Sequence, residues 1–167
     1  MLPTKIISGG QTGVDRAALD VAIELGLPHG GWCPRGRLAE DGRIPAKYEL
    51  TELASSDYAA RTEQNVLDSS GTLILYVGRL ARGTELTSKL ALRHRKPLCP
   101  INLEGEPNLA AARRWLALHA IEILNVAGPR ESSRAGIYEL AQAFLRRLLV
   151  ADRRPEAERR APRSVAL

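Results

Sequence analysis

Short apolar runs alternate along the chain with longer segments in which apolar residues recur every three or four positions. The run GTLILYV at 71–77 is apolar throughout, which is typical of a strand buried on both faces of a parallel sheet. The segment VDRAALDVAIELG, which begins at Val14, shows the spacing of an amphipathic helix, with Gly26 as a stop signal. This alternation predicts an α/β fold, a Rossmann-like, doubly wound three-layer sandwich with a mainly parallel central sheet.

The same patterns give approximate bounds for each element. Strands are expected at 5–8, 30–33, 71–77, 98–101 and 122–126, and helices at 14–25, 60–69, 84–94, 109–119 and 133–150. Residues 48–53 form either a short strand or a turn. Pro100 cannot donate a hydrogen bond to a neighbouring strand, so the strand at 98–101 is expected near an edge of the sheet.

The chain has the size and composition of one globular domain, with 167 residues and a hydrophobic content of 44%. We assign residues 1–150 to a single Rossmann-like ligand-binding domain. Residues 151–167 read ADRRPEAERRAPRSVAL, without apolar periodicity, and are expected to form a charged, flexible C-terminal tail. The sequence shows neither the apolar region of a signal peptide nor that of a membrane span, so we expect a cytoplasmic protein.

The formal net charge of +5 at first suggests a nucleic-acid-binding protein. However, five of the 24 Lys and Arg residues and three of the 19 acidic residues lie in the tail, so the domain itself carries only +3. Aromatic residues make up 4% of the chain and offer few platforms for stacking bases. We therefore expect a small phosphorylated ligand, with neither nucleic acid nor a membrane as partner. The two cysteines and three widely spaced histidines indicate no metal site.

In a parallel α/β sheet, ligands bind at the loops that follow the carboxyl ends of the strands. The first such loop, residues 9–13, is a glycine turn between an expected strand and an expected helix. Its backbone N–H groups lie beside the positive end of the helix dipole, so they would form a cradle for phosphate. The spacing departs from the G-x-G-x-x-G fingerprint, so a standard dinucleotide site is not expected.

Two further loops carry residues suited to an anion. The RGR motif at 35–37 stands where a dinucleotide site would have the acidic residue that binds ribose, and its two arginines suit a phosphate. In the loop after the strand at 71–77, Thr84 is expected to cap the next helix. Glu85 then lies in the first turn, where it either faces the ligand or stabilises the helix dipole.

The loop after the last expected strand, GPRESS at 128–133, follows the same pattern. Arg130 can supply a positive charge to an anionic ligand, and Ser132 or Ser133 is expected to cap the last helix. The sequence contains no G-x-S-x-G elbow and no Walker A motif, which argues against a serine hydrolase or an ATPase.

Five blocks, in this order along the chain, resemble the molybdenum cofactor carrier protein family: GGQTGVDRAALD, GWCPRGRLAEDGRIP, RTEQNVLDS, GTELTSKLA and NVAGPRESS. That family belongs to a Rossmann-like group related to the lysine-decarboxylase-like or cytokinin phosphoribohydrolase proteins. The resemblance implies a homo-oligomer that binds the molybdenum cofactor (molybdopterin), a pterin with a terminal phosphate, without turnover. It also implies molybdoenzymes or enzymes of cofactor biosynthesis as partners. Together with the loop arguments, it gives the candidate cofactor-binding residues Gly9, Gly10, Gln11, Thr12, Gly13, Arg35, Gly36, Arg37, Gly83, Thr84, Glu85, Gly128, Arg130 and Ser132.

Two alternative functions stay open. The same pocket would suit a sensor that binds nucleotides or nucleotide sugars. A phosphoribohydrolase-like enzyme that acts on nucleoside monophosphates would need Glu85 as its acid–base group. The phosphoribohydrolases carry P-G-G-x-G-T-x-x-E, whereas here Glu85 directly follows Thr84. Because each residue of offset along a helix turns a side chain by about 100°, this spacing favours a binding protein without catalytic residues over a hydrolase.

Overall fold

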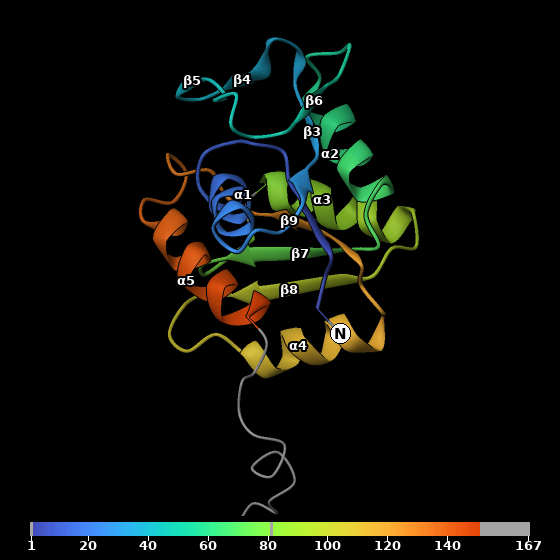
Figure 1. Cartoon of the computed structure of the whole chain (residues 1–167), viewed down its shortest axis with the longest axis vertical. Coiled ribbons are helices and arrows are strands. Elements are labelled where there is room, and N and C mark those ends of the chain that lie inside the picture. Colours follow the sequence, from blue (N-terminus) through green and yellow to red (C-terminus); the bar gives the residue numbers. More distant parts are fainter. Residues whose placement is uncertain (1, 81, 151–167) are drawn as a thin grey trace, which may run out of the picture.

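The computed structural model describes residues 2–80 and 82–150, and within them a sheet of five strands is flanked by five α-helices (Figure 1). The strand order is β2-β1-β9-β7-β8, and every neighbouring pair is parallel. The strands are β1 (Lys5–Ile7), β2 (His29–Gly30), β7 (Gly71–Tyr76), β8 (Leu98–Asn102) and β9 (Ile123–Ala127). The helices are α1 (Val14–Glu24), α2 (Tyr58–Leu67), α3 (Arg82–Arg93), α4 (Leu109–Leu118) and α5 (Ile137–Leu149). The predicted tail at 151–167 lies outside the described residues.

The helices form two layers, one on each face of the sheet. On one face α5 packs between α1 and α4, and these helices share one large core cluster with Leu73, Leu75 and Val126. On the other face α2 packs against α3, and Val66 and Leu90 of these helices form a separate cluster. The predicted Rossmann-like three-layer architecture is therefore confirmed. In the described ranges, no helix combines the length and the apolar character needed to span a lipid bilayer.

The positions of β7 and β8 in the sheet follow from their sequences. The strand β7 is buried from Gly71 to Leu75 and lies between β9 and β8, as its unbroken apolar run predicts. The strand β8 lies at one end of the strand order, so the edge position expected from Pro100 is confirmed.

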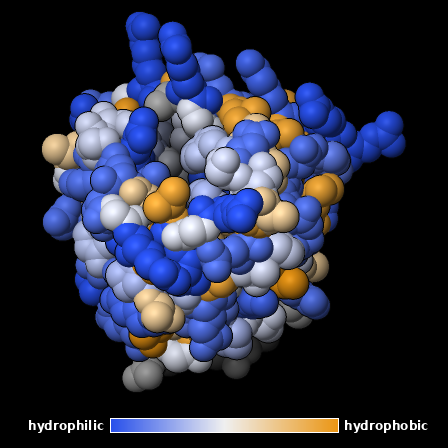
Figure 2. All heavy atoms as spheres, turned by 90° about the horizontal axis from the view of Figure 1, so that it is seen from above, coloured by the Kyte–Doolittle hydropathy of each residue, from blue (hydrophilic) through white to orange (hydrophobic). Residues whose placement is uncertain are grey.

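Between β2 and α2 the chain leaves the sheet and forms a segment that we call the excursion, residues 31–57. Its β3 (Trp32–Cys33) runs parallel to β6 (Thr51–Glu52), whereas β4 (Leu38–Ala39) and β5 (Gly42–Arg43) form an antiparallel hairpin. A short 3₁₀ turn, η1 (Arg35–Arg37), lies between β3 and β4. The excursion occupies the end of the molecule opposite β8 and α4 (Figure 1). Seen from that end, hydrophilic residues predominate and hydrophobic ones are scattered among them (Figure 2).

The single strand expected at 30–33 is wrong, because β2 and β3 belong to different sheets. Gly31 between them has a φ of +122°, and a Cβ there would lie 2.1 Å from the carbonyl oxygen of Ser8. Asn65 of α2 then pairs with β3: its side chain accepts from the N–H of Trp32 at 2.8 Å and donates to the Trp32 carbonyl at 3.0 Å. The glycine thus allows the chain to turn out of the sheet, and the asparagine satisfies the backbone that has left it.

The start of α5 also differs from the prediction. The helix begins at Ile137 rather than at Ser133, with Gly136 as its N-cap residue. The carboxylate of Glu131 accepts the N–H groups of Gly136 and Tyr138. The capping role expected of Ser132 or Ser133 is therefore filled by Glu131, whose charge also suits the positive end of the helix.

The helix α3 begins at Arg82, two residues earlier than predicted. Thr84 therefore lies inside the first turn, where it is buried, and the prediction that it caps the helix is wrong. Glu85 is in the first turn as expected and is exposed to solvent.

Candidate functional site

The loops that follow β1 and β9 and the start of α3, the helix after β7, border a recess in two parts at the carboxyl edge of the sheet. The outer cleft has a volume of about 580 Å³. The inner cavity has a volume of about 20 Å³, which is room for a water molecule. Both are bordered by Tyr58, Gly83 and Gly128, so they adjoin one another.

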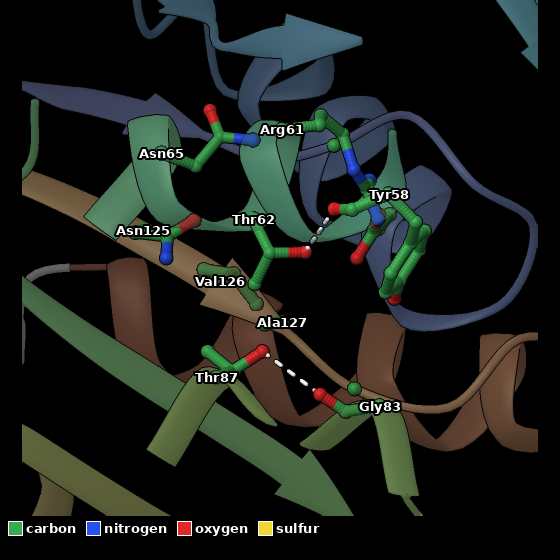
Figure 3. A pocket seen from close by; sticks show the side chains of 12 residues that line it. Tyr58, Arg61, Thr62, Asn65, Gly83, Thr87, Asn125, Val126 and Ala127 are labelled. Carbon is green, nitrogen blue, oxygen red and sulfur yellow. Dashed lines mark hydrogen bonds and ion pairs between the residues drawn. The ribbon is translucent and has the colours of Figure 1, made fainter. Parts of the chain in front are cut away.

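The two parts differ in their lining. The outer cleft is lined by Gln11, Tyr58, Arg82, Gly83, Thr84, Leu86, Gly128, Pro129, Arg130 and Ser133. The inner cavity is lined by Gly9, Asp15, Tyr58, Arg61, Thr62, Asn65, Gly83, Thr87, Asn125, Val126, Ala127 and Gly128 (Figure 3). The outer cleft is therefore wide and carries arginines, whereas the inner cavity is narrow and mostly polar.

A buried ion pair borders the inner cavity. Arg61 of α2 donates from Nη1 to Oδ2 of Asp15 in α1 at 3.2 Å, and the two side chains are only 4% and 8% exposed. Burial raises the pKa of Asp15, although the charge of Arg61 and the N–H of Gln11 lower it in part. Gly9 makes this approach possible, because a Cβ there would lie 1.4 Å from Arg61 Nη1.

The guanidinium of Arg61 has unused donor capacity. Its Cζ lies 4.3 Å from the centre of the Tyr58 ring, so the aromatic ring covers the cation. Its Nε is buried and has no hydrogen-bond partner among the described residues. A buried donor without a partner is costly, so the inner cavity favours a ligand or water that brings an acceptor group.

The remaining polar side chains of the inner cavity come from α2, α3 and β9 (Figure 3). Thr62 and Thr87 each donate from their hydroxyl group to the carbonyl four residues earlier, those of Tyr58 and Gly83, at 2.9 and 3.1 Å. Asn125 donates from Nδ2 to Oγ1 of Thr72 at 3.1 Å. These bonds fix the side chains, so the cavity has a preformed polar wall.

Residues from three of the four predicted segments line the recess. Gly9 and Gln11 come from the first loop and Gly128 and Arg130 from the last, whereas Gly83 and Thr84 lie in the first turn of α3. Parallel strands bring these loops together because their carboxyl ends lie at one edge of the sheet.

The glycine turn at 9–13 packs more tightly than a simple anion cradle would. A Cβ on Gly13, where φ is +75°, would lie 2.4 Å from the carbonyl oxygen of Pro129, and one on Gly10 would lie 2.4 Å from a methyl carbon of Leu50. The N–H of Gln11 donates to Asp15, and the N–H of Thr12 donates to the side chain of Gln11. Two amides of the expected phosphate cradle therefore already have partners within the chain.

The predicted motif Arg35-Gly36-Arg37 lies in the excursion, apart from the residues that line the recess. The guanidinium of Arg37 donates to four backbone carbonyls, those of Ile44, Pro45, Tyr48 and Leu50. The N–H of Gly36 donates to Glu52, and Arg35 is exposed. Arg37 thus holds the excursion together in this structure, and a contact between these three residues and a ligand stays a prediction.

Two more predicted residues lie beside the recess rather than in its lining. Glu85 is exposed on α3. Ser132 neighbours the lining residue Ser133 and contacts Glu40 of the excursion.

Sequence reasoning missed the residues that α2 brings to the inner cavity. Arg61, Thr62 and Asn65 are buried polar residues of α2. Their spacing of i, i+1 and i+4 places them on one face of the helix, within the block RTEQNVLDS. A row of polar residues on one face of this predicted helix was therefore the signal in the sequence that could have identified them. Asp15 directly follows the glycine turn, but its ion-pair partner lies forty-six residues further along the chain, where no local pattern indicates it.

The described residues contain no group of three or more His, Cys, Asp or Glu side chains that could hold a metal ion. Both cysteines are buried, and burial raises the pKa of each thiol, that of Cys99 to about 11. Protein thiolates are therefore scarce at neutral pH.

The fold and the recess define a Rossmann-like α/β protein with a polar site at the carboxyl edge of its parallel sheet. The sequence model described as "Circularly permutated YpsA SLOG family" matches residues 6–149, and the chain belongs to that family. The chain is also 48% identical to a crystallised protein named "Putative molybdenum carrier protein" from Syntrophus aciditrophicus SB, with a TM-score of 0.85. That alignment covers 90% of this chain and 96% of the other. No curated protein matches the chain. The resemblance seen in the five sequence blocks is thereby confirmed.

Proposed function

We propose that this protein is a molybdenum cofactor carrier that binds the phosphorylated pterin in the recess without turnover. The observation that carries the proposal is the junction of a wide, arginine-bearing cleft with a narrow polar cavity at the carboxyl edge of the sheet. The name of the protein from Syntrophus aciditrophicus SB supports a carrier role for this chain as well.

Each part of the recess suits a different part of such a ligand. Arg82 and Arg130 of the outer cleft would hold the terminal phosphate by charge-assisted hydrogen bonds. The inner cavity has room only for a water molecule, so a water held by Asp15 and Arg61 would connect these side chains to the polar edge of a pterin in the outer cleft. Such a water would also bring an acceptor to the unpartnered Nε of Arg61.

The first test identifies the ligand without assuming it. Protein purified natively would be denatured, and the released small molecules would be identified by mass spectrometry. A pterin supports the carrier, whereas a nucleotide or nucleotide sugar would replace the proposal with the sensor alternative.

The second test is an equilibrium titration with the molybdenum cofactor. Arg130→Ala should weaken binding by about tenfold, because it removes one charge-assisted contact to phosphate. Arg134→Ala is the matched control: Arg134 is exposed in the same segment but is not part of the lining, so its loss should change the affinity by less than about twofold. Absence of binding by the wild type would overturn the proposal.

The hydrolase alternative depends on Glu85, which is exposed and is not part of the lining of either cavity. Release of adenine from AMP by the purified protein would nevertheless establish it. Assembly into a homo-oligomer and delivery to molybdoenzymes or cofactor-biosynthesis enzymes are further parts of the proposal that follow from the family resemblance. A cytoplasmic location is proposed with them.

A further inference from the structure

A carboxylate of the chain itself lies at the rim of the outer cleft. Glu40, at the turn of the β4–β5 hairpin, accepts hydrogen bonds from the hydroxyl groups of Thr12 and Ser132. It also accepts the backbone N–H of Ser132 at 3.1 Å, and Nε of Arg130 lies 3.6 Å away. Donors from the first and the last loop therefore converge on one anion.

The hairpin that carries Glu40 has a second, separate attachment. Asp41 accepts two hydrogen bonds from Arg16, at 2.9 and 3.0 Å, and the Arg16 side chain is 10% exposed. The N–H of Glu40 donates to the side chain of Gln11 at 2.9 Å. The Asp41–Arg16 pair can thus keep the hairpin attached to α1 even when the Glu40 carboxylate leaves its donors.

The donors around Glu40 are those that bind oxyanions in proteins: two hydroxyl groups, a backbone N–H and an arginine. Burial acts to raise the pKa of Glu40, but the hydrogen bonds from Ser132 and Thr12 and the charge of Arg130 together outweigh it and lower the pKa overall. The group is therefore ionised at neutral pH and occupies the donors as a monoanion. Arg130 also lines the outer cleft, so this carboxylate and an anion in the cleft would share a donor.

We propose that Glu40 is an internal competitor for the anionic group of the ligand. A phosphate displaces the carboxylate from Thr12, Ser132 and Arg130, while the hairpin stays attached through Asp41. The inference rests on the proposed function and adds a specificity determinant to it. Because binding must replace an existing set of charge-assisted bonds, phosphate dianions and pyrophosphate bind in preference to monoanions such as acetate.

The test uses pyrophosphate as a probe in titration calorimetry with the full chain. In Glu40→Gln the competing charge is gone, so pyrophosphate should bind at least about fivefold more tightly than to the wild type. The matched control is Glu49→Gln, which removes the same charge from an exposed position of the excursion. Its affinity should stay within about twofold of the wild type.

Hydrogen exchange of the wild type gives a second readout that needs no variant. Pyrophosphate should accelerate exchange of the backbone amides at 38–43, because the hairpin then loses its attachment through the Glu40 carboxylate and keeps only the one through Asp41, whereas acetate at the same concentration should not.

The outcomes separate the two levels of the proposal. Equal affinity of the wild type and Glu40→Gln, or unchanged exchange at 38–43 with bound pyrophosphate, would overturn the competitor and leave the anion site intact. Failure of both proteins to bind pyrophosphate or phosphate would overturn the anion site itself, and with it the phosphate part of the proposed function.

Discussion

Asp15 and Arg61 show how strongly this fold depends on single buried residues. The two charges are removed from water, and each is the other's main compensation. The pair also requires a residue without a side chain at position 9, because the guanidinium occupies the space of a Cβ there. A sequence can show the glycine and the aspartate, but not that an arginine of a later helix fills the space between them.

We predict that Asp15→Asn lowers the free energy of unfolding by about 3 kcal/mol or more, because Arg61 would be left buried without a counter-charge. Urea denaturation followed by circular dichroism measures the change. Combining Asp15→Asn with Arg61→Met should recover part of the loss, since no unpaired charge remains. A loss below about 1 kcal/mol in the single variant would show that water reaches the guanidinium.

Some of the predicted residues line the recess, and for these the signal in the sequence is local. The loops after β1 and β9 are marked by glycines directly after apolar runs and contribute lining residues such as Gln11 and Arg130. Arg37 gave the same local signal, yet its side chain binds backbone carbonyls. An arginine in a loop looks the same in sequence whether it binds a ligand or the chain itself, because both offer oxygen acceptors.

At the scale of elements, the excursion is held by hydrogen bonds more than by an extended sheet. Its strands are two residues long, and its small core consists of Cys33, Ile44, Tyr48 and Leu50 packed against Leu19 of α1. Arg37 crosses this segment and joins residues 44–50 to η1 through four carbonyls. The excursion should therefore respond to substitutions that leave the main sheet unchanged.

We predict that Arg37→Ala accelerates amide exchange in residues 44–50 by about tenfold or more but leaves β7 and β9 protected, because the substitution removes bonds only within the excursion. Arg37→Lys should not restore protection, since an ammonium group cannot reach four carbonyls in a planar fork. Hydrogen exchange followed by mass spectrometry tests both variants. Unchanged exchange in Arg37→Ala would mean that Arg37 is not needed to hold the excursion together, and would favour its predicted role as a ligand contact.

A second polar cluster connects the excursion to the helices. Asp20 of α1 accepts hydrogen bonds from Lys47 and Tyr48 of the excursion and from Tyr138 of α5, each at 2.8–2.9 Å. Burial acts to raise the pKa of Asp20, but these hydrogen bonds outweigh it and lower the pKa below the usual 3.8. Burial and the bond to Asp20 raise the pKa of Tyr138 to about 12, so this tyrosine stays a donor at neutral pH.

The lowered pKa of Asp20 leads to a prediction about pH. A carboxyl group with a lower pKa in the folded state stabilises the fold fully above its unfolded value of 3.8 and loses this contribution as the pH falls through the folded value. The melting temperature of the wild type should exceed that of Asp20→Asn by a constant amount between pH 5 and 7. The difference should shrink below about pH 4. A difference that stays constant into acid would mean that Asp20 is not ionised in this cluster.

The elements themselves were largely predictable, because apolar periodicity reports burial directly. The failures lie where a side chain replaces backbone pairing. Asn65 substitutes for a strand beside Trp32, and Glu131 substitutes for the expected serine cap of α5. Asn65 is distant in sequence from Trp32, and Glu131 reaches α5 across a turn, so no local sequence pattern predicts either contact.

At the scale of the whole molecule, the strand order explains why the recess exists. The three interior strands β1, β9 and β7 are neighbours and parallel, so their following loops are brought together although they are far apart in the chain. The net positive charge of the chain is therefore best considered position by position. Arg82 and Arg130 line the recess, whereas the tail accounts for two of the five excess charges and follows every lining residue in the sequence.

We predict that a chain ending after residue 150 keeps its stability and its affinity for pyrophosphate. The family model matches residues 6–149, and all lining residues of both cavities lie between 9 and 133. Ending at 150 retains the carbonyl of Val150, which accepts from Arg113 at 3.2 Å, and adds a carboxylate beside that arginine. The melting temperature should therefore change by less than about 2 °C.

The affinity of the shortened chain for pyrophosphate tests whether the charges of the tail take part in binding. At 0.15 M salt the Debye length is about 8 Å, so the two excess charges of the tail can raise anion affinity only if they come close to the recess. Titration calorimetry with pyrophosphate at 0.05 and 0.15 M salt should give affinities for the two chains within about twofold of each other at the higher salt. A loss of tenfold or more at 0.15 M salt would mean that arginines after residue 150 take part in binding. The site would then extend beyond the parallel-sheet domain.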